Sequence, residues 1–233
     1  HELKTPMTTI SGFVDGILDG TIPPNQQKKY LRIVSDEVNR LSRLVVSMLN
    51  LSRIEAGEMK LTRQKVDVVD STIQTLFQLE SQIEKRGLEV EGLDHEPLYV
   101  DADPDLLHQV IYNLTDNACK FANQNGTLSF SFEKEGNRAM IGVKNTGEGL
   151  SKQEISRVFD RFYKTDRSRG LDKPGVGLGL YIVRSIVTLH GGEIIVRSVK
   201  GEYTEFVFTL PLYNPMRIFK KKTDGKEEPN AKS

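Results

Sequence analysis

Histidine and glutamate stand side by side at the first two positions, as His1 and Glu2. At about 100° per residue, the apolar residues of the first segment form one helical stripe, and His1 and Thr5 lie on the opposite, polar face. An exposed imidazole is neutral near pH 7, and an adjacent carboxylate can hold one ring N–H so that the other nitrogen acts as a nucleophile. Taken alone, the pair is better explained as an ordinary surface histidine.

A second set of polar side chains lies on the helix that Asp103 and Pro104 are expected to open, as N-cap and first residue. Asn113, Asn117 and Lys120 fall within about 60° of one another on this helix, and its apolar residues centre about 110° away. Two amides and a lysine on one edge of a buried helix are costly unless they bind something. Oxygen ligands suit Mg²⁺, and a lysine suits phosphate.

Two glycine-rich stretches follow, Asn-Thr-Gly-Glu-Gly at residues 145–149 and Gly-Val-Gly-Leu-Gly-Leu at residues 175–180. Glycine lets the backbone approach a ligand closely, and the second stretch runs into a helix whose first N–H groups favour phosphate. Between them, residues 164–173 carry several cationic side chains and predict a mobile cationic lid over phosphate groups, with a solvated loop as the alternative.

In combination, these stretches resemble the sequence boxes of sensor histidine kinases from two-component systems. His1-Glu2-Leu3-Lys4-Thr5-Pro6 resembles the phosphoacceptor box of that family. Residues 113–121 resemble the N box, which these kinases share with other Bergerat-type ATPases. Residues 145–149, 159–164 and 175–180 resemble the G1, F and G2 boxes, in the family order.

The resemblance implies phosphorylation of His1 by ATP, with Glu2 as the base that orients the imidazole. It implies that Thr5 positions water when phosphate is removed from a partner response regulator. It also implies Mg²⁺ as a cofactor, with Asn117 as its ligand and Asn113 supporting it. The residues expected to bind ATP and Mg²⁺ are Asn113, Asn117, Lys120, Phe121, Asn145, Gly147, Gly149, Tyr163, Lys164, Gly175, Gly177, Gly179 and Leu180.

One position departs from the family pattern. The G1 box usually begins with an aspartate that accepts a hydrogen bond from the adenine amine, and here the residue is Asn145. An amide oxygen still accepts, but a charge-assisted bond contributes about 1.5–3 kcal/mol and a neutral one about 0.5–1.5 kcal/mol. The expected penalty is about 1 kcal/mol, or several-fold in affinity.

The phosphoacceptor box opens a predicted helical hairpin. Apolar residues recur at intervals of three and four over residues 3–17 and 31–48, with a Gly-Thr-Ile-Pro-Pro break at residues 20–24. Two such stripes exceed what one hairpin can bury, which predicts a homodimer with a four-helix bundle. The alternative is a hairpin packed on its own C-terminal domain.

The rest of the chain mixes helix and strand signals without strict alternation. We therefore predict an α+β fold, in which a hairpin at residues 1–60 precedes a Bergerat-type catalytic ATP-binding domain at residues 61–213. That domain is expected to be an α/β sandwich with a mixed, mostly antiparallel sheet and helices on one face. Residues 214–233 predict a disordered basic tail.

Composition excludes several function classes. The 32 Lys and Arg balance the 32 Asp and Glu, so no global field favours nucleic acid. A single cysteine, Cys119, excludes a disulfide framework and a cysteine-rich zinc site. Because the chain begins with histidine, we expect a cytoplasmic fragment of an inner or plasma membrane protein, with any membrane contact made only through an upstream segment.

The expected partner is the receiver domain of a response regulator. Two other functions remain open on sequence alone. The first is a degenerate dimeric scaffold without enzyme activity, whose nucleotide site is weakened at Asn145. The second is a Bergerat ATPase that is not a kinase. This alternative is weaker, because such ATPases lack a phosphoacceptor box on a helical hairpin.

Overall fold

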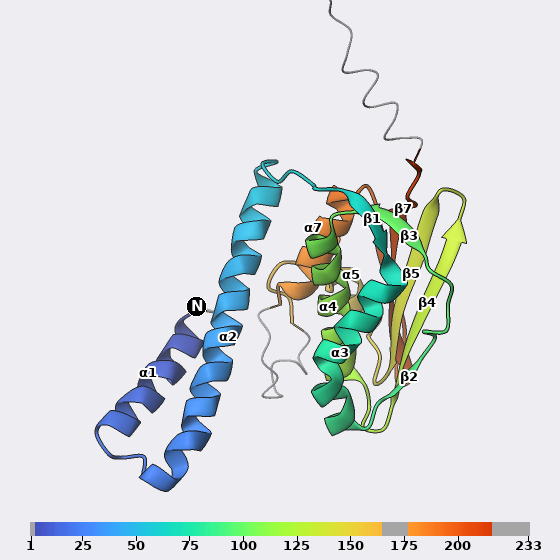
Figure 1. The fold of residues 1–233 in the computed structure, drawn as a ribbon. Helices are drawn as coiled ribbons and strands as arrows, with labels where there is room; N and C mark the ends of the chain where they lie inside the picture. Colours follow the sequence, from blue (N-terminus) through green and yellow to red (C-terminus); the bar gives the residue numbers. More distant parts are fainter. Residues whose placement is uncertain (1–2, 165–176, 216–233) are drawn as a thin grey trace, which may run out of the picture.

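The computed structural model describes residues 3–164 and 177–215. Two antiparallel helices, α1 (Lys4–Leu18) and α2 (Pro24–Glu55), form the predicted hairpin (Figure 1). Pro24 is the first residue of α2, where its missing N–H costs nothing. The rings of Phe13 and Tyr30 lie 4.9 Å apart and join the two helices near their connection. The hairpin prediction is therefore confirmed.

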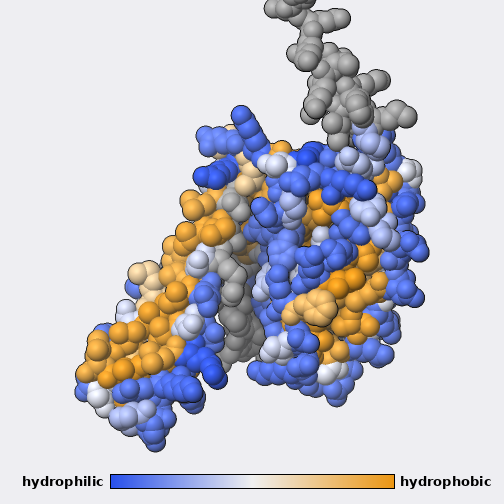
Figure 2. Space-filling model, in the orientation of Figure 1, coloured by the Kyte–Doolittle hydropathy of each residue, from blue (hydrophilic) through white to orange (hydrophobic). Residues whose placement is uncertain are grey.

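Hydrophobic side chains gather on the surface of this hairpin (Figure 2). Leu31, Val38 and Val45 recur every seven residues along α2 and remain 51%, 47% and 42% exposed in the single chain. By contrast, Leu44 and Leu51 are buried, and α2 packs against α7 (Gly179–Leu189). One side of α2 thus packs against other parts of the same chain, and a second apolar stripe, formed by Leu31, Val38 and Val45, stays uncovered.

A five-stranded sheet forms the other half of the molecule, with the strand order β2-β4-β5-β7-β6. Its strands are β2 (Glu89–Glu91), β4 (Thr127–Glu135), β5 (Arg138–Thr146), β6 (Ile194–Val199) and β7 (Tyr203–Pro211). Only the β2–β4 pair in this sheet is parallel. A separate antiparallel pair joins β1 (Gln64–Asp67) to β3 (Tyr99–Ala102).

Three helices cover the face of the sheet that is turned toward the hairpin (Figure 1). They are α3 (Val68–Arg86), α4 (Pro104–Phe121) and α7, and the short α5 (Lys152–Arg157) follows β5. Leu114, Ile182 and Phe208 are fully buried between these helices and the sheet. The α+β prediction with a mixed, mostly antiparallel sheet is confirmed, whereas β2 was not predicted.

Local signals for the helix ends are also borne out. The Asp103 carboxylate accepts a hydrogen bond from the Leu106 N–H and caps α4, while Ser151 and Glu154 form the expected capping box at α5.

Within the described residues, no helix is both long and apolar enough to cross a membrane. Nearly all of the predicted tail, from residue 216 onward, lies outside the described residues.

Candidate nucleotide and phosphoacceptor site

The phosphoacceptor box lies at the start of α1. His1 and Glu2 are outside the described residues, so their predicted roles stay predictions. Thr5 is exposed in the first turn, and its carbonyl oxygen accepts a hydrogen bond from the Thr9 hydroxyl at 3.2 Å. Thr5 therefore lies on the polar side of α1, as its helical position predicts.

Helix α4 brings the two predicted amides next to the start of α7. Asn113 and Asn117, one turn apart, are both half-buried. A Cβ atom on Gly179, the first residue of α7, would lie 3.8 Å from Asn113 Oδ1. One turn beyond Asn117, the Lys120 ammonium forms an ion pair with Asp116. The edge of α4 that faces α7 thus carries amide oxygens, with a paired lysine near its end.

Asn145 lies at the end of β5 and is only 3% exposed. Its Nδ2 donates a hydrogen bond to the Thr146 carbonyl oxygen at 3.1 Å. This contact orients the amide, so Oδ1 is the acceptor atom that Asn145 can present to a ligand. The neighbouring Gly147 forms a β-bridge with Ala122, which directly follows α4. The predicted G1 stretch and the end of the predicted N box therefore meet.

The second glycine of the G1 stretch is enclosed by backbone. Gly149 has a φ of +64°, and a Cβ atom there would lie 2.2 Å from the Val199 carbonyl oxygen. The turn between β6 and β7 also reaches this stretch, since Gly201 N–H donates to the Glu148 carbonyl oxygen at 2.7 Å. Only glycine fits such a position without displacing β6.

The predicted F and G2 stretches also touch. The Phe162 N–H donates to the Gly177 carbonyl oxygen at 3.0 Å, and Phe162 itself adopts a φ of +61°. The Arg157 guanidinium lies 4.7 Å from the centre of the Tyr163 ring. Lys164 is half-buried, whereas the rest of the predicted lid and Gly175 lie outside the described residues.

These contacts join four segments that are distant in sequence. The N-terminus of α7 is suited to phosphate because Leu178, at its N-cap, provides no side-chain hydrogen bond. Leu180, in the same first turn, is half-buried and packs on the core. Amide oxygens from Asn113 and Asn117 match what Mg²⁺ prefers, and the described residues hold no cluster of three His, Cys, Asp or Glu that would suit another metal.

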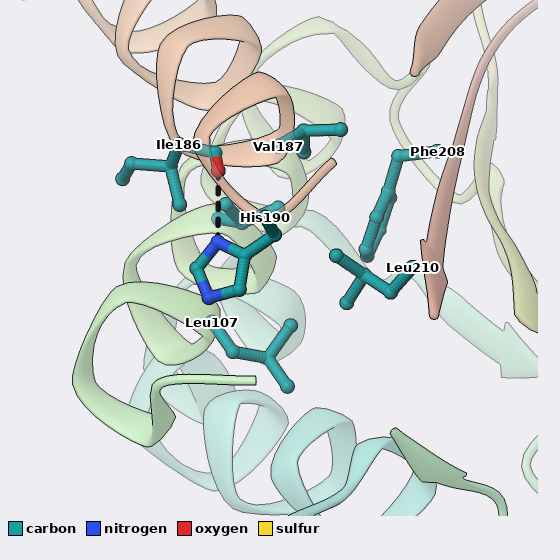
Figure 3. A pocket seen from close by; sticks show the side chains of 7 residues that line it. Leu107, Ile186, Val187, His190, Phe208 and Leu210 are labelled. Atoms are coloured by element: carbon teal, nitrogen blue, oxygen red, sulfur yellow. Dashed lines mark hydrogen bonds between the residues drawn. The ribbon is translucent and has the colours of Figure 1, made fainter. Parts of the chain in front are cut away.

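The remaining histidines and the cysteine lie outside this arrangement. His190 is 1% exposed at the end of α7, in an apolar pocket with no room for a water molecule (Figure 3). Its Nδ1 donates to the Ile186 carbonyl oxygen at 2.8 Å, and its Nε2 accepts from the Asp103 N–H at 3.0 Å. Burial lowers the pKa of His190 and raises the pKa of the Cys119 thiol to about 11. Both side chains are buried in the fold.

Some contacts around the site were not predicted. The most extensive is made by Arg86, whose guanidinium donates to three carbonyl oxygens at the end of α4. Another is the hydrogen bond between Asn145 and Thr146. Neither has a sequence signal, because each ends on a backbone oxygen that every residue type carries.

The chain matches two family models. Residues 1–57 match the His Kinase A (phospho-acceptor) domain, and residues 102–214 match the histidine kinase-, DNA gyrase B- and HSP90-like ATPase. Sensor protein SrrB of Staphylococcus aureus is 32% identical over 212 residues, which are 91% of this chain and 36% of SrrB. The chain thus spans about a third of the length of the curated relatives it matches.

Solved structures agree with this match. Histidine kinase AdeS of Acinetobacter baumannii superposes with a TM-score of 0.75 at 25% identity, over 92% of this chain and 98% of that one. Histidine kinase ThkA, in complex with response regulator protein TrrA, gives 0.70 at 25% identity over 91% of this chain and 59% of that one. With its phosphoacceptor hairpin followed by an ATPase domain, the chain belongs to the sensor histidine kinases, whose catalytic core it comprises.

Proposed function

We propose that this core phosphorylates His1 with ATP and Mg²⁺ and then passes the phosphoryl group to an aspartate of a response regulator. The observation that carries the proposal is that Asn113 lies beside the start of α7 and that the G1 stretch meets the end of α4, on the same chain as a phosphoacceptor hairpin. The phosphoacceptor match distinguishes the chain from the gyrase B-like and HSP90-like ATPases that share the second model.

In this proposal, the chain's own residues position the reactants. Asn117 ligates Mg²⁺ and Asn113 supports it, while Lys120, Lys164 and the N–H groups at the start of α7 hold the phosphates. Phe121, which is 37% exposed, lies against the nucleotide. Bound Mg²⁺ supplies positive charge between the phosphates. Glu2 holds one ring N–H of His1, so the other nitrogen attacks the γ-phosphorus in line. The bond between that phosphorus and the β–γ bridging oxygen breaks, and ADP leaves.

Two partners follow from the hairpin. The uncovered stripe of Leu31, Val38 and Val45 supports a homodimer, because each side chain is about half exposed and burying the rest contributes about 0.7–1.5 kcal/mol. A response regulator is proposed as the second partner, by analogy with the complex of ThkA and TrrA. By resemblance to the phosphoacceptor box, Thr5, which is exposed on α1, is proposed to orient water for removal of the phosphoryl group from that regulator.

The first test is incubation with ATP and Mg²⁺, with the ATP carrying radioactive phosphorus at the γ position. We expect acid-labile label on the protein, because a phosphorus–nitrogen bond hydrolyses in acid. His1→Gln abolishes the label, while His95→Gln, which changes a histidine exposed on the ATPase domain, retains it. Label that survives in His1→Gln contradicts the assignment of the phosphoacceptor.

The degenerate scaffold is the alternative that this experiment separates. A scaffold without catalysis gives no label even when ATP binds. Asn117→Ala provides a second control, since loss of the proposed Mg²⁺ ligand eliminates label while the hairpin and its dimer remain. A wild-type chain that forms the dimer but neither binds ATP nor becomes labelled supports the scaffold and refutes the proposal.

A further inference from the structure

Arg86 is the last residue of α3, and its side chain contacts the C-terminal end of α4. Its Nη1 donates to the Cys119 carbonyl oxygen at 2.8 Å and to the Lys120 carbonyl oxygen at 2.6 Å. Its Nη2 donates to the Ala122 carbonyl oxygen at 2.6 Å. The last four carbonyl oxygens of a helix have no partner within the helix, so one guanidinium satisfies much of the C-terminus of α4.

Two further contacts fasten the same corner. The Asn125 N–H donates to the Arg86 carbonyl oxygen at 2.9 Å, and the Glu89 N–H donates to the Gly126 carbonyl oxygen at 2.9 Å. The turn after α3 and the turn after α4 are therefore held together through both the backbone and the side chain of Arg86. A lysine could not replace it, because its single ammonium lacks the planar fork that reaches several oxygens at fixed geometry.

The carbonyl oxygens that accept hydrogen bonds from Arg86 lie at the end of the predicted N box. Lys120 supplies one of them and Ala122, which follows Phe121, supplies another. Ala122 forms a β-bridge with Gly147, and a Cβ atom on Gly147 would lie 2.6 Å from the Phe121 carbonyl oxygen. Any shift in the last turn of α4 therefore moves the predicted N box and the G1 stretch together.

We propose that Arg86 is a positioning residue for nucleotide binding, which sets the last turn of α4 and through it Lys120, Phe121 and the G1 stretch. The Arg86 guanidinium is engaged with backbone carbonyl oxygens, and the residue lies outside both matched family segments. Its positive charge also lies at the negative end of the α4 dipole, which stabilises the turn in the same sense. The inference rests on the proposed binding of ATP at this site.

Arg138 offers a matched control, because it also donates to a backbone oxygen just beyond a helix. Its Nη1 donates to the Gly191 carbonyl oxygen at 2.9 Å and to Thr209 Oγ1 at 3.3 Å. Gly191 follows the C-terminal end of α7, whereas the proposed phosphate contacts lie at its N-terminal end. Arg86→Met and Arg138→Met thus both remove a guanidinium from backbone carbonyl oxygens, but only the first does so behind the site.

The experiment measures the dissociation constant of a fluorescent ATP analogue, at a temperature where circular dichroism shows each variant to be folded. We expect Arg86→Met to weaken binding by about fivefold or more, equivalent to about 1 kcal/mol, and Arg138→Met to change it less than about twofold. In the kinase assay, Arg86→Met raises the KM for ATP more than it lowers kcat, because the lost contribution is to binding.

Arg86→Lys keeps the test decisive if Arg86→Met does not fold. It retains the charge and the aliphatic stem but not the fork, so we expect a smaller loss of affinity in the same direction. Wild-type affinity in a folded Arg86 variant, or an equal loss in Arg138→Met, overturns the inference while leaving the proposed function intact. A wild-type chain that binds no nucleotide overturns both.

Discussion

Asn145→Asp tests the proposal that Asn145 accepts a hydrogen bond from the adenine amine, at a position where the family usually has an aspartate. Asn145 is 3% exposed, and its Nδ2 donates to the Thr146 carbonyl oxygen at 3.1 Å, which leaves Oδ1 to accept from the base. Replacing a neutral acceptor by a charged one strengthens the hydrogen bond by about 1 kcal/mol. We therefore expect ATP to bind about fivefold more tightly to the variant.

The same substitution has a cost in the free protein. The Thr146 carbonyl oxygen loses the amide donor and faces a carboxylate oxygen instead, although the Asn123 N–H still donates to it at 3.1 Å. One lost hydrogen bond corresponds to about 0.5–1.5 kcal/mol, and the repulsion between the two oxygens adds to this. The free energy of unfolding should fall by about 1–2 kcal/mol in the absence of nucleotide.

Equilibrium titration with ATP and urea unfolding measure the two effects. Purine riboside triphosphate, which lacks the adenine amine, should bind the wild type and the variant equally. Asn137→Asp is the matched control for charge, because it lies in the exposed turn at the opposite end of β5, about 26 Å away at 3.3 Å per residue. It should change neither quantity.

Three outcomes refute the reasoning. Unchanged or weaker ATP binding means that Asn145 does not accept from the adenine amine. Equal gains with ATP and with the analogue that lacks the amine assign the effect to general electrostatics. If the variant binds ATP more than about tenfold more tightly than the wild type, Asn145 severely weakens the wild-type nucleotide site, which favours the degenerate scaffold.

The uncovered stripe predicts that Val38→Glu converts a dimer to a monomer in analytical ultracentrifugation, because a buried charge without a partner is costly; a persistent dimer contradicts this. Burial lowers the pKa of His190 in the folded protein. Below about pH 6.5 the unfolded state therefore binds more protons than the folded state. As the pH is lowered from there toward the folded pKa, the free energy of unfolding falls by up to about 1.4 kcal/mol per pH unit. Urea unfolding at several pH values should show this slope in His95→Gln but not in His190→Leu. Gly149→Ala should destabilise the protein by at least about 2 kcal/mol more than Gly201→Ala. Both glycines have positive φ, but a Cβ atom lies 2.2 Å from the Val199 carbonyl oxygen only at the first, and thermal unfolding compares them.

Much of the fold follows from local signals. The stripes of α1 and α2, the cap at Asp103 and the capping box at Ser151 are short-range patterns, and each appears at its predicted place. β2 was missed because it has only three residues and pairs with β4, whose first residue lies 38 positions further along. Such a strand exists through its partner, and its own sequence carries too few alternating positions to predict it.

The hairpin shows where a pattern leaves two structures open. A helical stripe reports that a face is buried but not what buries it. In α2, Leu51 is covered within the chain near α7, whereas Val38 and Val45 stay exposed. Both readings of the stripe, packing on the chain's own ATPase domain and packing on a second hairpin, thus apply to different residues of one helix.

The predicted site likewise contains residues that the sequence identifies and residues that it does not. Residues that hold a ligand must have particular side chains, so the residues proposed for this role, Asn113, Lys120 and the glycines of the G1 stretch, leave a recognisable spacing. Residues that hold the backbone in place act on carbonyl oxygens, which every position offers, and Arg86 therefore leaves no pattern. The departure at Asn145 depends on the same kind of contact, because the hydrogen bond from Nδ2 to Thr146 leaves Oδ1 as the amide atom that could accept from a ligand. A change of residue type within a motif is thus interpretable only together with the backbone atoms beside it.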